Sequence, residues 1–483
     1  MKSDKNIRQQ TLIAVLWNGM SRFGRQALSL LITILLLRIL QPEDFGLFAL
    51  VMLFVSLLKM LVEFGFTAVI IQGKEIDQKA LSSIFWFNLI NGAFFTLLII
   101  ALAPAISKYF DEPALKELIQ ILSLLILLSA ASIVPKALIE KNLKYKFLAK
   151  IEISTIFISG ATGILMAFNG FGVLSLVAQQ LTQSILWFFL IWTGHNWRPL
   201  FWFSFKRILK FLTMGASLFS NYFLAFLADN LDYFLIGKKL GKYDLGLYNR
   251  GFIIISLPVN LIAHSIGQVM LASFSLIQED KQKLRAVFLM MNRVVALFTF
   301  PIMILLIVQS PALIPLILGN QWLDMIPLFQ VFCGISILAS LNALLGPLII
   351  AQGQSELIFK DGLIQKSIII ISILIGIQWG LSGVILARFL AEMINVFVTF
   401  YHAKRSIQLN IFQQIHNLSG LILINAIIFW ILHLLYYQLG ASPEFLVASS
   451  LVAFGLYWLL LYLFRIRAYS DLLKSIQSGI IRK

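Results

Sequence analysis

The stretch "LQPEDFGLF" at residues 40–48 recurs as "LGKYDLGLY" at residues 240–248. Leu, Asp, Gly and Leu hold matching places in the two copies, and a Ser-Leu pair follows each copy in the same register. Glycine permits a tight turn, and Asp is a natural cap for the helix that follows. The recurrence predicts a duplicated chain, although a turn of this kind suits any helical hairpin.

The composition indicates a membrane protein. Of the 483 residues, 59% are hydrophobic and only 12% are charged, whereas a soluble domain is about half apolar and about a quarter charged. Apolar runs of roughly 20 residues, each long enough to cross a bilayer, recur from end to end. Only helices of this length satisfy their own backbone in lipid. We therefore expect an all-α polytopic membrane protein with about 14 transmembrane helices.

The predicted spans follow from these runs and from the Pro and Gly residues between them. They are residues 12–40, 45–66, 82–103, 115–135, 148–168, 172–193, 208–236, 246–274, 286–308, 326–350, 363–378, 381–402, 418–438 and 445–464.

The distribution of positive charge predicts the orientation. With the N-terminus in the cytoplasm, most of the 38 Lys and Arg residues fall at cytoplasmic helix ends. The opposite ends hold Lys108, Lys116, Lys238, Lys239 and Lys242. This bias favours an even number of spans with both termini in the cytoplasm. It also explains the net charge of +16 by topology, so nucleic acid is not an expected partner.

In this topology both copies of the opening motif lie on the outer face, six spans apart. A weaker echo, "NGFGVLSL" at 169–176 and "WGLSGVIL" at 379–386, opens the sixth and twelfth spans. Because six is an even number, the two halves have the same orientation, as in transporters built from parallel repeats. We predict pseudo-symmetric six-helix lobes over residues 1–200 and 201–405, followed by two extra helices and a basic cytoplasmic tail over 406–483.

The sequence lacks the motifs of intrinsic catalysis. The run "GKKLGK" at 237–242 departs from the P-loop spacing, and no metal-ligand cluster or nucleophile motif is present. The single Cys333 allows no intrachain disulfide. We therefore expect no enzyme, no metal site and no cofactor, apart from Na⁺ or a proton as a coupling ion.

Three stretches resemble one transporter family. They are "LLLRILQPEDFGLFALVMLFVSLLKMLVEFGFTAVIIQ" at 35–72, "PKALIEKNLKYKFLAKIEI" at 135–153 and "GFGVLSLVAQQL" at 170–181. All three are similar to Wzx-type polysaccharide flippases of the multidrug/oligosaccharidyl-lipid/polysaccharide exporter superfamily, in the branch of colanic-acid and teichuronic-acid exporters. The resemblance covers the first twelve spans.

The resemblance implies a two-lobed bundle that works by alternating access in the bacterial inner membrane. Its cargo would be an undecaprenyl-diphosphate-linked oligosaccharide, moved from the cytoplasmic to the periplasmic leaflet for exopolysaccharide or O-antigen synthesis. The implied partners are this lipid-linked oligosaccharide, membrane lipids, and the polysaccharide polymerase and chain-length machinery. Two alternatives stay open: an ion-coupled drug exporter of the same superfamily, and a membrane glycan polymerase or ligase, which would need a large outer catalytic loop.

Charges inside the spans are the candidate site residues, because each costs about 2.5–3.5 kcal/mol at the bilayer centre. Arg22 and Arg25 lie three residues apart on one helix face, and Arg can grip a diphosphate bidentately. The resemblance places Lys59 and Arg250 on helices that carry cavity cations in related flippases. We expect these four residues to bind the diphosphate, with snorkelling to the headgroups as the alternative for Arg250.

The other charges within spans divide into pairs and a candidate coupling site. Lys59 with Glu63 and Arg388 with Glu392 are spaced i,i+4 and can form ion pairs, while Arg293 is expected to pair with an acid elsewhere. Asp229 and Asp232 share a helix face and are candidates for Na⁺ or proton coupling, with pairing to basic residues as the alternative.

Overall fold

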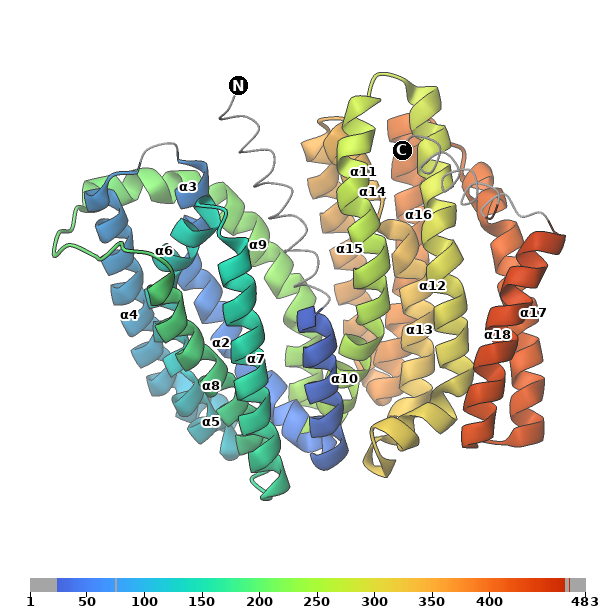
Figure 1. Ribbon diagram of the computed structural model, residues 1–483, viewed down its shortest axis with the longest axis horizontal. Helices are drawn as coiled ribbons and strands as arrows, with labels where there is room; N and C mark the ends of the chain where they lie inside the picture. Colours follow the sequence, from blue (N-terminus) through green and yellow to red (C-terminus); the bar gives the residue numbers. More distant parts are fainter. Residues whose placement is uncertain (1–23, 74–75, 465–468, 470–483) are drawn as a thin grey trace. The chain divides into compact units, whose positions relative to one another are not determined.

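The structure, a computed structural model, describes residues 24–73, 76–464 and 469. Every regular element among these residues is a helix, which confirms the predicted all-α fold for this part of the chain (Figure 1). Contacts within the chain divide it into two units, Met1–Gly246 and Leu247–Lys483.

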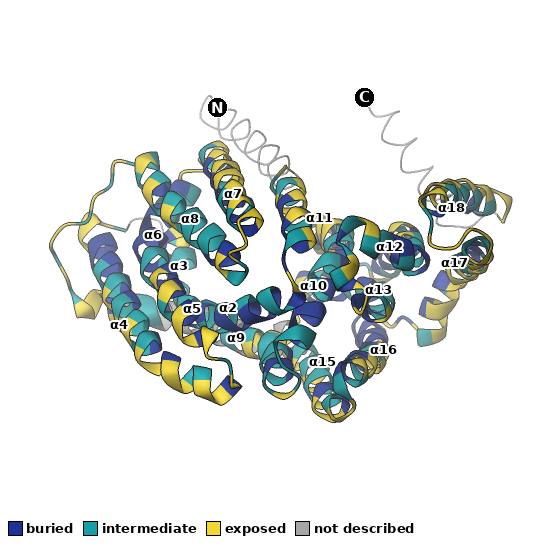
Figure 2. Cartoon of the chain, turned by 90° about the horizontal axis from the view of Figure 1, so that it is seen from below, coloured by how far each residue is buried: buried dark blue, intermediate teal, exposed yellow. Residues whose placement is uncertain are grey.

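The N-terminal unit is a bundle around α6. Its elements are residues 24–39, α2 (Pro42–Glu63), α3 (Phe66–Gln72), α4 (Gln78–Phe110), α5 (Ala114–Leu122), α6 (Leu124–Lys141), α7 (Tyr145–Phe168), α8 (Val173–Ile191), η1 (Trp192–Gly194) and α9 (Phe205–Lys239). In the most apolar windows, 67% of the residues are buried in the α5–α6 span but only 17% in α4. Figure 2 shows the exposed stripe along α4. This stripe includes Phe94 and Leu97, as expected of a helix that faces lipid.

The second unit is a helical bundle in which helices distant in the sequence also pack on one another. It begins within α10 (Lys242–Val259) and continues through the π-helical turn η2 (Asn260–His264), α11 (Ser265–Leu276), α12 (Lys281–Ile317), η3 (Asn320–Trp322), α13 (Met325–Asn342), α14 (Leu345–Ala351), α15 (Ser355–Gly376), η4 (Ile377–Trp379), α16 (Gly380–Ile407), α17 (Ile411–Leu439) and α18 (Pro443–Leu463). The helix α12 packs on α13 and on both C-terminal helices α17 and α18, and α15 packs on α16.

Helices lie over each predicted span within the described residues. Eleven segments of this part of the chain are long and apolar enough to cross a membrane, and one of them contains both α15 and α16. Neither the helix over 24–39 nor α9 is among the eleven. The number of fourteen crossings therefore stays a prediction.

The helix α9 packs with the N-terminal unit, although the repeat assigns it to the second half. It contacts α2, α3 and α4, and the boundary between the units accordingly falls at Gly246. The lobe boundaries inferred from the sequence repeat remain a prediction. A repeat indicates where the chain was duplicated, whereas the two units are defined by which helices pack together.

The 200-residue register of the opening motif extends to the ends of the helices. The first described helix ends at residue 39 and α9 ends at Lys239, while α2 begins at Pro42 and α10 at Lys242. The α-helix of the second span is also interrupted at matching positions of the 200-residue register in both halves. It breaks at Phe64 and Gly65 in the first half and passes into the π-helical turn 260–264 in the second. The structure therefore repeats where the sequence does.

The two copies of the motif meet through their glycines. A Cβ on Gly46 would overlap the carbonyl oxygen of Lys242 and lie 2.7 Å from its carbonyl carbon. A Cβ on Gly246 would overlap the carbonyl oxygen of Pro42 and lie 2.7 Å from that carbonyl carbon. The reciprocal contact is that of a local pseudo-two-fold axis, and it explains why both copies keep the glycine.

Each copy of the motif is also bonded to the ends of neighbouring helices. The Asp44 carboxylate accepts a hydrogen bond from the Gln41 N–H at 3.1 Å, which closes a capping box, and another from the N–H of Val173 at the start of α8. Asp44 is thus the third residue of its helix rather than the N-cap. Lys242 pairs with Glu112 at 2.9 Å, which ties the second copy to the turn between α4 and α5.

Alanine at Gly46 or Gly246 should destabilise the protein. The added Cβ meets backbone rather than a flexible side chain, and overpacking of this kind costs about 1–3 kcal/mol. We expect a lower melting temperature in detergent for each variant, measured by size-exclusion thermostability. Gly455→Ala is the matched control, because no atom lies within 4 Å of its Cβ position. An equal melting temperature for Gly46→Ala and Gly455→Ala would show that the crossing is not tight.

The start of α9 is held to α4 by an exposed ion pair that should respond to acid. Asp77 caps α4 by accepting a hydrogen bond from the Ala80 N–H at 3.1 Å, and its other oxygen pairs with Arg207. The Arg207 side chain holds the pKa of Asp77 below its usual value, which is about 3.9. The pair therefore contributes stability above that value and loses it as the pH falls through the lowered pKa.

We expect amide exchange at residues 205–209 to quicken, relative to the intrinsic rate, as the pH falls below about 4. Asp77→Asn keeps a good N-cap residue but removes the charge, so it should abolish this pH dependence while leaving α4 protected. Hydrogen–deuterium exchange measures both effects. The same acid response in Asp77→Asn would assign it to another group.

Candidate functional site

A polar cavity of about 340 Å³ opens inside the N-terminal unit. Its wall comes from α2, α3, α6 and α8, and it combines charged, hydroxyl, amide and aromatic side chains. The lining residues are Lys59, Glu63, Thr67, Leu125, Leu128, Ser129, Ser132, Ile133, Lys136, Gln180, Gln183, Ser184 and Trp187. We call this space the lysine cavity.

Two lysines and one glutamate give the lysine cavity its charge. Lys59 and Lys136 repel one another, and Glu63 attracts Lys59. Lys136 also lies 3.8 Å from Glu140 in the next turn of α6. The wall therefore carries one more positive than negative charge, and an anion between the two lysines would relieve their repulsion.

A break in the second span positions Glu63. Helix α2 ends at this residue, Phe64 takes a left-handed conformation with φ 39°, and Gly65 follows with φ 76°. Glycine tolerates this backbone at no steric cost. The break lets the Glu63 carboxylate accept a hydrogen bond from the Thr67 hydroxyl at 2.9 Å, so the two helices that flank the break share one polar contact.

Uncharged polar groups complete the wall. Gln180, Gln183 and Ser184 come from one stretch of α8, and Ser129 and Ser132 from α6. Amides and hydroxyls both donate and accept hydrogen bonds, and Trp187 adds an apolar face. This combination suits a ligand with both phosphate and hydroxyl groups.

A second cavity, of about 570 Å³, lies on the other side of Glu63. Glu63 and Thr67 line both spaces, and here they share the wall with Asp229, Asn230 and the rings of Phe219 and Phe226. We call this space the acidic cavity. Asp232, three residues further along α9, is 3% exposed and accepts a hydrogen bond from the Tyr233 N–H at 2.9 Å. Only Asp229 of the two predicted coupling residues therefore lines the acidic cavity.

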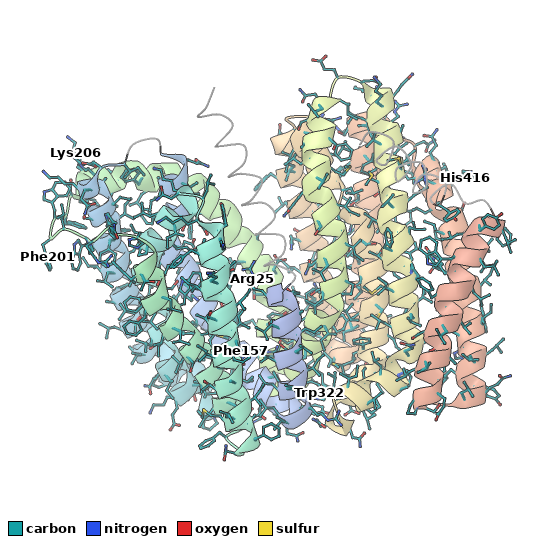
Figure 3. All side chains as sticks on the ribbon, in the orientation of Figure 1. Arg25, Phe157, Phe201, Lys206, Trp322 and His416 are labelled. Atoms are coloured by element: carbon teal, nitrogen blue, oxygen red, sulfur yellow. The ribbon has the colours of Figure 1, made fainter. Side chains whose placement is uncertain are left out.

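Arg25 has a carboxylate partner that lies far away in the sequence. Its guanidinium pairs with Glu152 of α7, and both side chains are about one quarter exposed. Figure 3 shows Arg25 at the start of the first described helix, beside α7. Arg22, its predicted companion, lies outside the described residues. The diphosphate role of both arginines stays a prediction.

The predicted charges of the second unit have contacts of several kinds. Arg293 donates to the amide oxygen of Asn417 on α17, and its pairing with an acid stays a prediction. Arg388 donates to the Tyr248 hydroxyl at 2.5 Å and lies over the Phe252 ring at 4.7 Å.

Glu392 accepts hydrogen bonds from the side-chain amides of Asn342 at 2.7 Å and Asn395 at 3.4 Å. The positive charges of Arg388 and Lys366 also act on this carboxylate. The Arg250 side chain is partly buried. None of these contacts assigns a transport role.

Lys136 was not predicted as a site residue, because its place near the end of a predicted span suggested a cytoplasmic end charge. The available signal was Ser129, Ser132 and Lys136 at intervals of three and four along α6, which places them on one helix face. Trp187 and Ser184 gave a similar signal beside Gln180 and Gln183 on α8.

Comparison with known sequences identifies the family. The family described as "Polysaccharide biosynthesis protein" matches residues 35–327. The chain belongs to this family. Among curated family relatives, the lipopolysaccharide biosynthesis protein WzxC of Escherichia coli (strain K12) is 26% identical over 82% of this chain and 81% of its own. The teichuronic acid biosynthesis protein TuaB of Bacillus subtilis (strain 168) is 27% identical over 62% of this chain and 63% of its own. The resemblance seen in the sequence is confirmed.

The fold of this family member is shared with solved transporters. The lipid II flippase MurJ in an inward closed conformation matches with a TM-score of 0.78 at 19% identity, over 95% of this chain and 100% of that one. An inward-facing multidrug resistance transporter of the MATE family matches with a TM-score of 0.61 at 15% identity, over 79% of this chain and 94% of that one. At these identities the likeness establishes the fold alone.

Removing either cavity lysine should reduce transport. A charged hydrogen bond is worth about 1.5–3 kcal/mol, so Lys59→Gln or Lys136→Gln should slow transport roughly tenfold or more if the ligand is an anion. Complementation of a strain that lacks the gene, with matched protein levels, gives the measurement. Lys150→Gln is the control, because this exposed lysine of α7 does not line the cavity. Full activity of the Lys59→Gln, Lys136→Gln double variant would remove the lysine cavity from the transport path.

Proposed function

We propose that the protein moves an undecaprenyl-diphosphate-linked oligosaccharide from the cytoplasmic to the periplasmic leaflet of the inner membrane. The observation that carries the proposal is the lysine cavity, in which two cations lie beside a wall of amides and hydroxyls. A diphosphate would lie between Lys59 and Lys136, and the sugar hydroxyls would bond to Gln180, Gln183 and the serines. The names of the relatives, which refer to lipopolysaccharide and teichuronic acid biosynthesis, support this class of cargo.

Alternating access would expose the cargo site to one face at a time. Arg22, Arg25 and Arg250 are the further cations proposed to hold the diphosphate during this movement. In this scheme Arg25 exchanges Glu152, its carboxylate partner in the structure, for the anionic cargo.

A coupling ion would act through Glu63. A proton or Na⁺ in the acidic cavity, between Asp229 and Glu63, would weaken the hold of Glu63 on Lys59 and so change the affinity of the lysine cavity for an anion. Asp232, which is buried and bonded to backbone, would support the position of α9 rather than bind the ion.

The runner-up function is an ion-coupled drug exporter, because MATE transporters share the fold. The wall of the lysine cavity favours the first proposal, since amides, hydroxyls and two lysines suit a polar anion better than an apolar cation. A glycan polymerase or ligase is a weaker candidate. The proposed partners beyond the cargo and membrane lipids are the polysaccharide polymerase and its chain-length machinery.

The leaflet that holds the cargo tests the proposal. In cells depleted of the protein, we expect complete polyprenyl-diphosphate repeat units to accumulate out of reach of a periplasmic glycosidase or lectin. Their accessibility before and after permeabilisation of the inner membrane measures this, and re-expression is the control. Repeat units that reach the periplasmic face but stay unpolymerised would indicate a polymerase. Unchanged lipid-linked pools with altered drug susceptibility would indicate a drug exporter.

A further inference from the structure

A third cavity, of about 420 Å³, lies at the end of the N-terminal unit where α8 leads into α9. It is lined by the turn between α6 and α7, with Asn142 and Lys144, and by the segment after α8, with His195, Asn196 and Trp197. It shares no lining residue with the lysine cavity or the acidic cavity. We call it the interfacial cavity.

One cation, Lys144, lines the interfacial cavity, and a second, Arg198, follows the lining residue Trp197 and acts electrostatically on His195 without lining the cavity itself. Lys144 gives one of its three ammonium hydrogens to the Gly194 carbonyl at 3.0 Å. Arg198 uses a single terminal nitrogen for the carbonyls of His195 at 3.1 Å and Trp197 at 2.8 Å. Neither cation has a carboxylate in ion-pair distance among the residues that the structure describes. Each therefore keeps donors for an anion.

Neutral donors lie beside these cations. Burial, and then the charge of Arg198, lowers the pKa of His195 below its ordinary value, so at neutral pH the ring is uncharged and can donate one hydrogen bond. The indole nitrogen of Trp197 is buried, and no described protein atom accepts its hydrogen. A buried donor in this state gains free energy from any acceptor that reaches it.

The walls of the interfacial cavity are rigid. Trp192 stacks on Trp197 with ring centroids 6.1 Å apart, and Phe85 of α4 contacts both rings. The segment is also tied to α4, because Gln78 donates to the Arg198 carbonyl at 2.6 Å and the Leu200 N–H donates to the Ser82 hydroxyl at 3.0 Å. The site is thus preformed.

The chain next to the interfacial cavity displays apolar rings. Phe201 is 96% exposed, and Phe203, Phe205 and Leu200 are also exposed. Figure 3 shows Phe201 and Lys206 at the same edge of this unit. Exposed rings interleaved with cations, at the ends of membrane helices, are typical of segments that lie in the headgroup layer.

We propose that the interfacial cavity binds the phosphate of an anionic phospholipid from the surrounding leaflet. Lys144 and Arg198 contact the phosphate, and His195 and Trp197 donate to its oxygens or to the rest of the headgroup. Phe201 and Phe203 lie among the acyl chains beside it. The occupant is a lipid rather than free phosphate, because the exposed rings next to the cavity have apolar partners only when acyl chains are present. Basic pockets between membrane helices bind anionic headgroups in the same way.

Native mass spectrometry of the purified full chain tests this proposal independently of transport. Phosphatidylglycerol and phosphatidylcholine of equal chain length are titrated into detergent-solubilised protein. We expect a retained phosphatidylglycerol that phosphatidylcholine does not replace. The Lys144→Gln, Arg198→Gln double variant should lower the phosphatidylglycerol affinity roughly fivefold or more. Lys116→Gln, an exposed cation at the start of α5, should leave it unchanged.

Further variants and a competitor keep the test decisive. Lys144→Arg preserves the charge and should preserve lipid binding, which guards against loss of binding through misfolding. Phe201→Ser with Phe203→Ser should weaken retention, whereas Phe168→Ser, an exposed ring at the opposite end of α7, should not. Equal retention of the two lipids would overturn the proposal. Displacement of the lipid by millimolar inorganic phosphate would overturn it too, because the site would then be one for a free anion.

Discussion

The reciprocal approach of Gly46 to Lys242 and of Gly246 to Pro42 is the constraint on which the N-terminal unit depends. Two helix N-termini come this close only if the crossing residues lack a Cβ, and any side chain there would separate the backbones. The contact fixes α2 against the start of α10. The hydrogen bond from the Val173 N–H to Asp44 and the ion pair of Lys242 with Glu112 then fix both helices to their neighbours. Glu63 is the last residue of α2, so its position depends on this anchor.

The repeat was visible in the sequence, but the contact between its two copies was not. Matching residues 200 positions apart predicted duplicated turns, and the helix ends at 39 and Lys239 agree with that register. That the two turns touch one another cannot be read from the pattern, because a turn glycine and a crossing glycine look alike in one chain. The break at Phe64 was missed for a similar reason. A left-handed aromatic residue is uncommon, and apolar residues lie on both sides of the break, so the predicted span ran through it to residue 66.

Among the charged residues, contacts within one helix could be predicted from the sequence, whereas contacts between helices could not. Lys59 and Glu63, spaced four apart on one helix face, line the same cavity, and their ion pairing stays a prediction. The partner of Arg25 is Glu152, on a helix more than a hundred residues away, and no local pattern specifies such a pair. Lys136 was assigned by topology to a helix end, yet α6 carries it into the lysine cavity. The folded position of Lys136, which the count of charges at helix ends could not supply, places it in the cavity wall.

Depth in the bilayer explains why similar side chains serve different roles in this protein. Lys59 projects from the middle of a span, where water is scarce and an unpaired charge is costly, so its environment must supply a counter-charge, from Glu63 or from an anionic ligand. Lys144 lies at the start of α7 and Arg198 in the segment between η1 and α9, where long side chains can reach the headgroup layer, and both bond to carbonyls of the segment after α8. Lys59 is attracted by Glu63 but repelled by Lys136, so its charge is only partly balanced. It can therefore exchange Glu63 for an anionic ligand in the proposed transport. A cation at the interface, held by carbonyls on a rigid aromatic frame, is suited to a partner that stays in place.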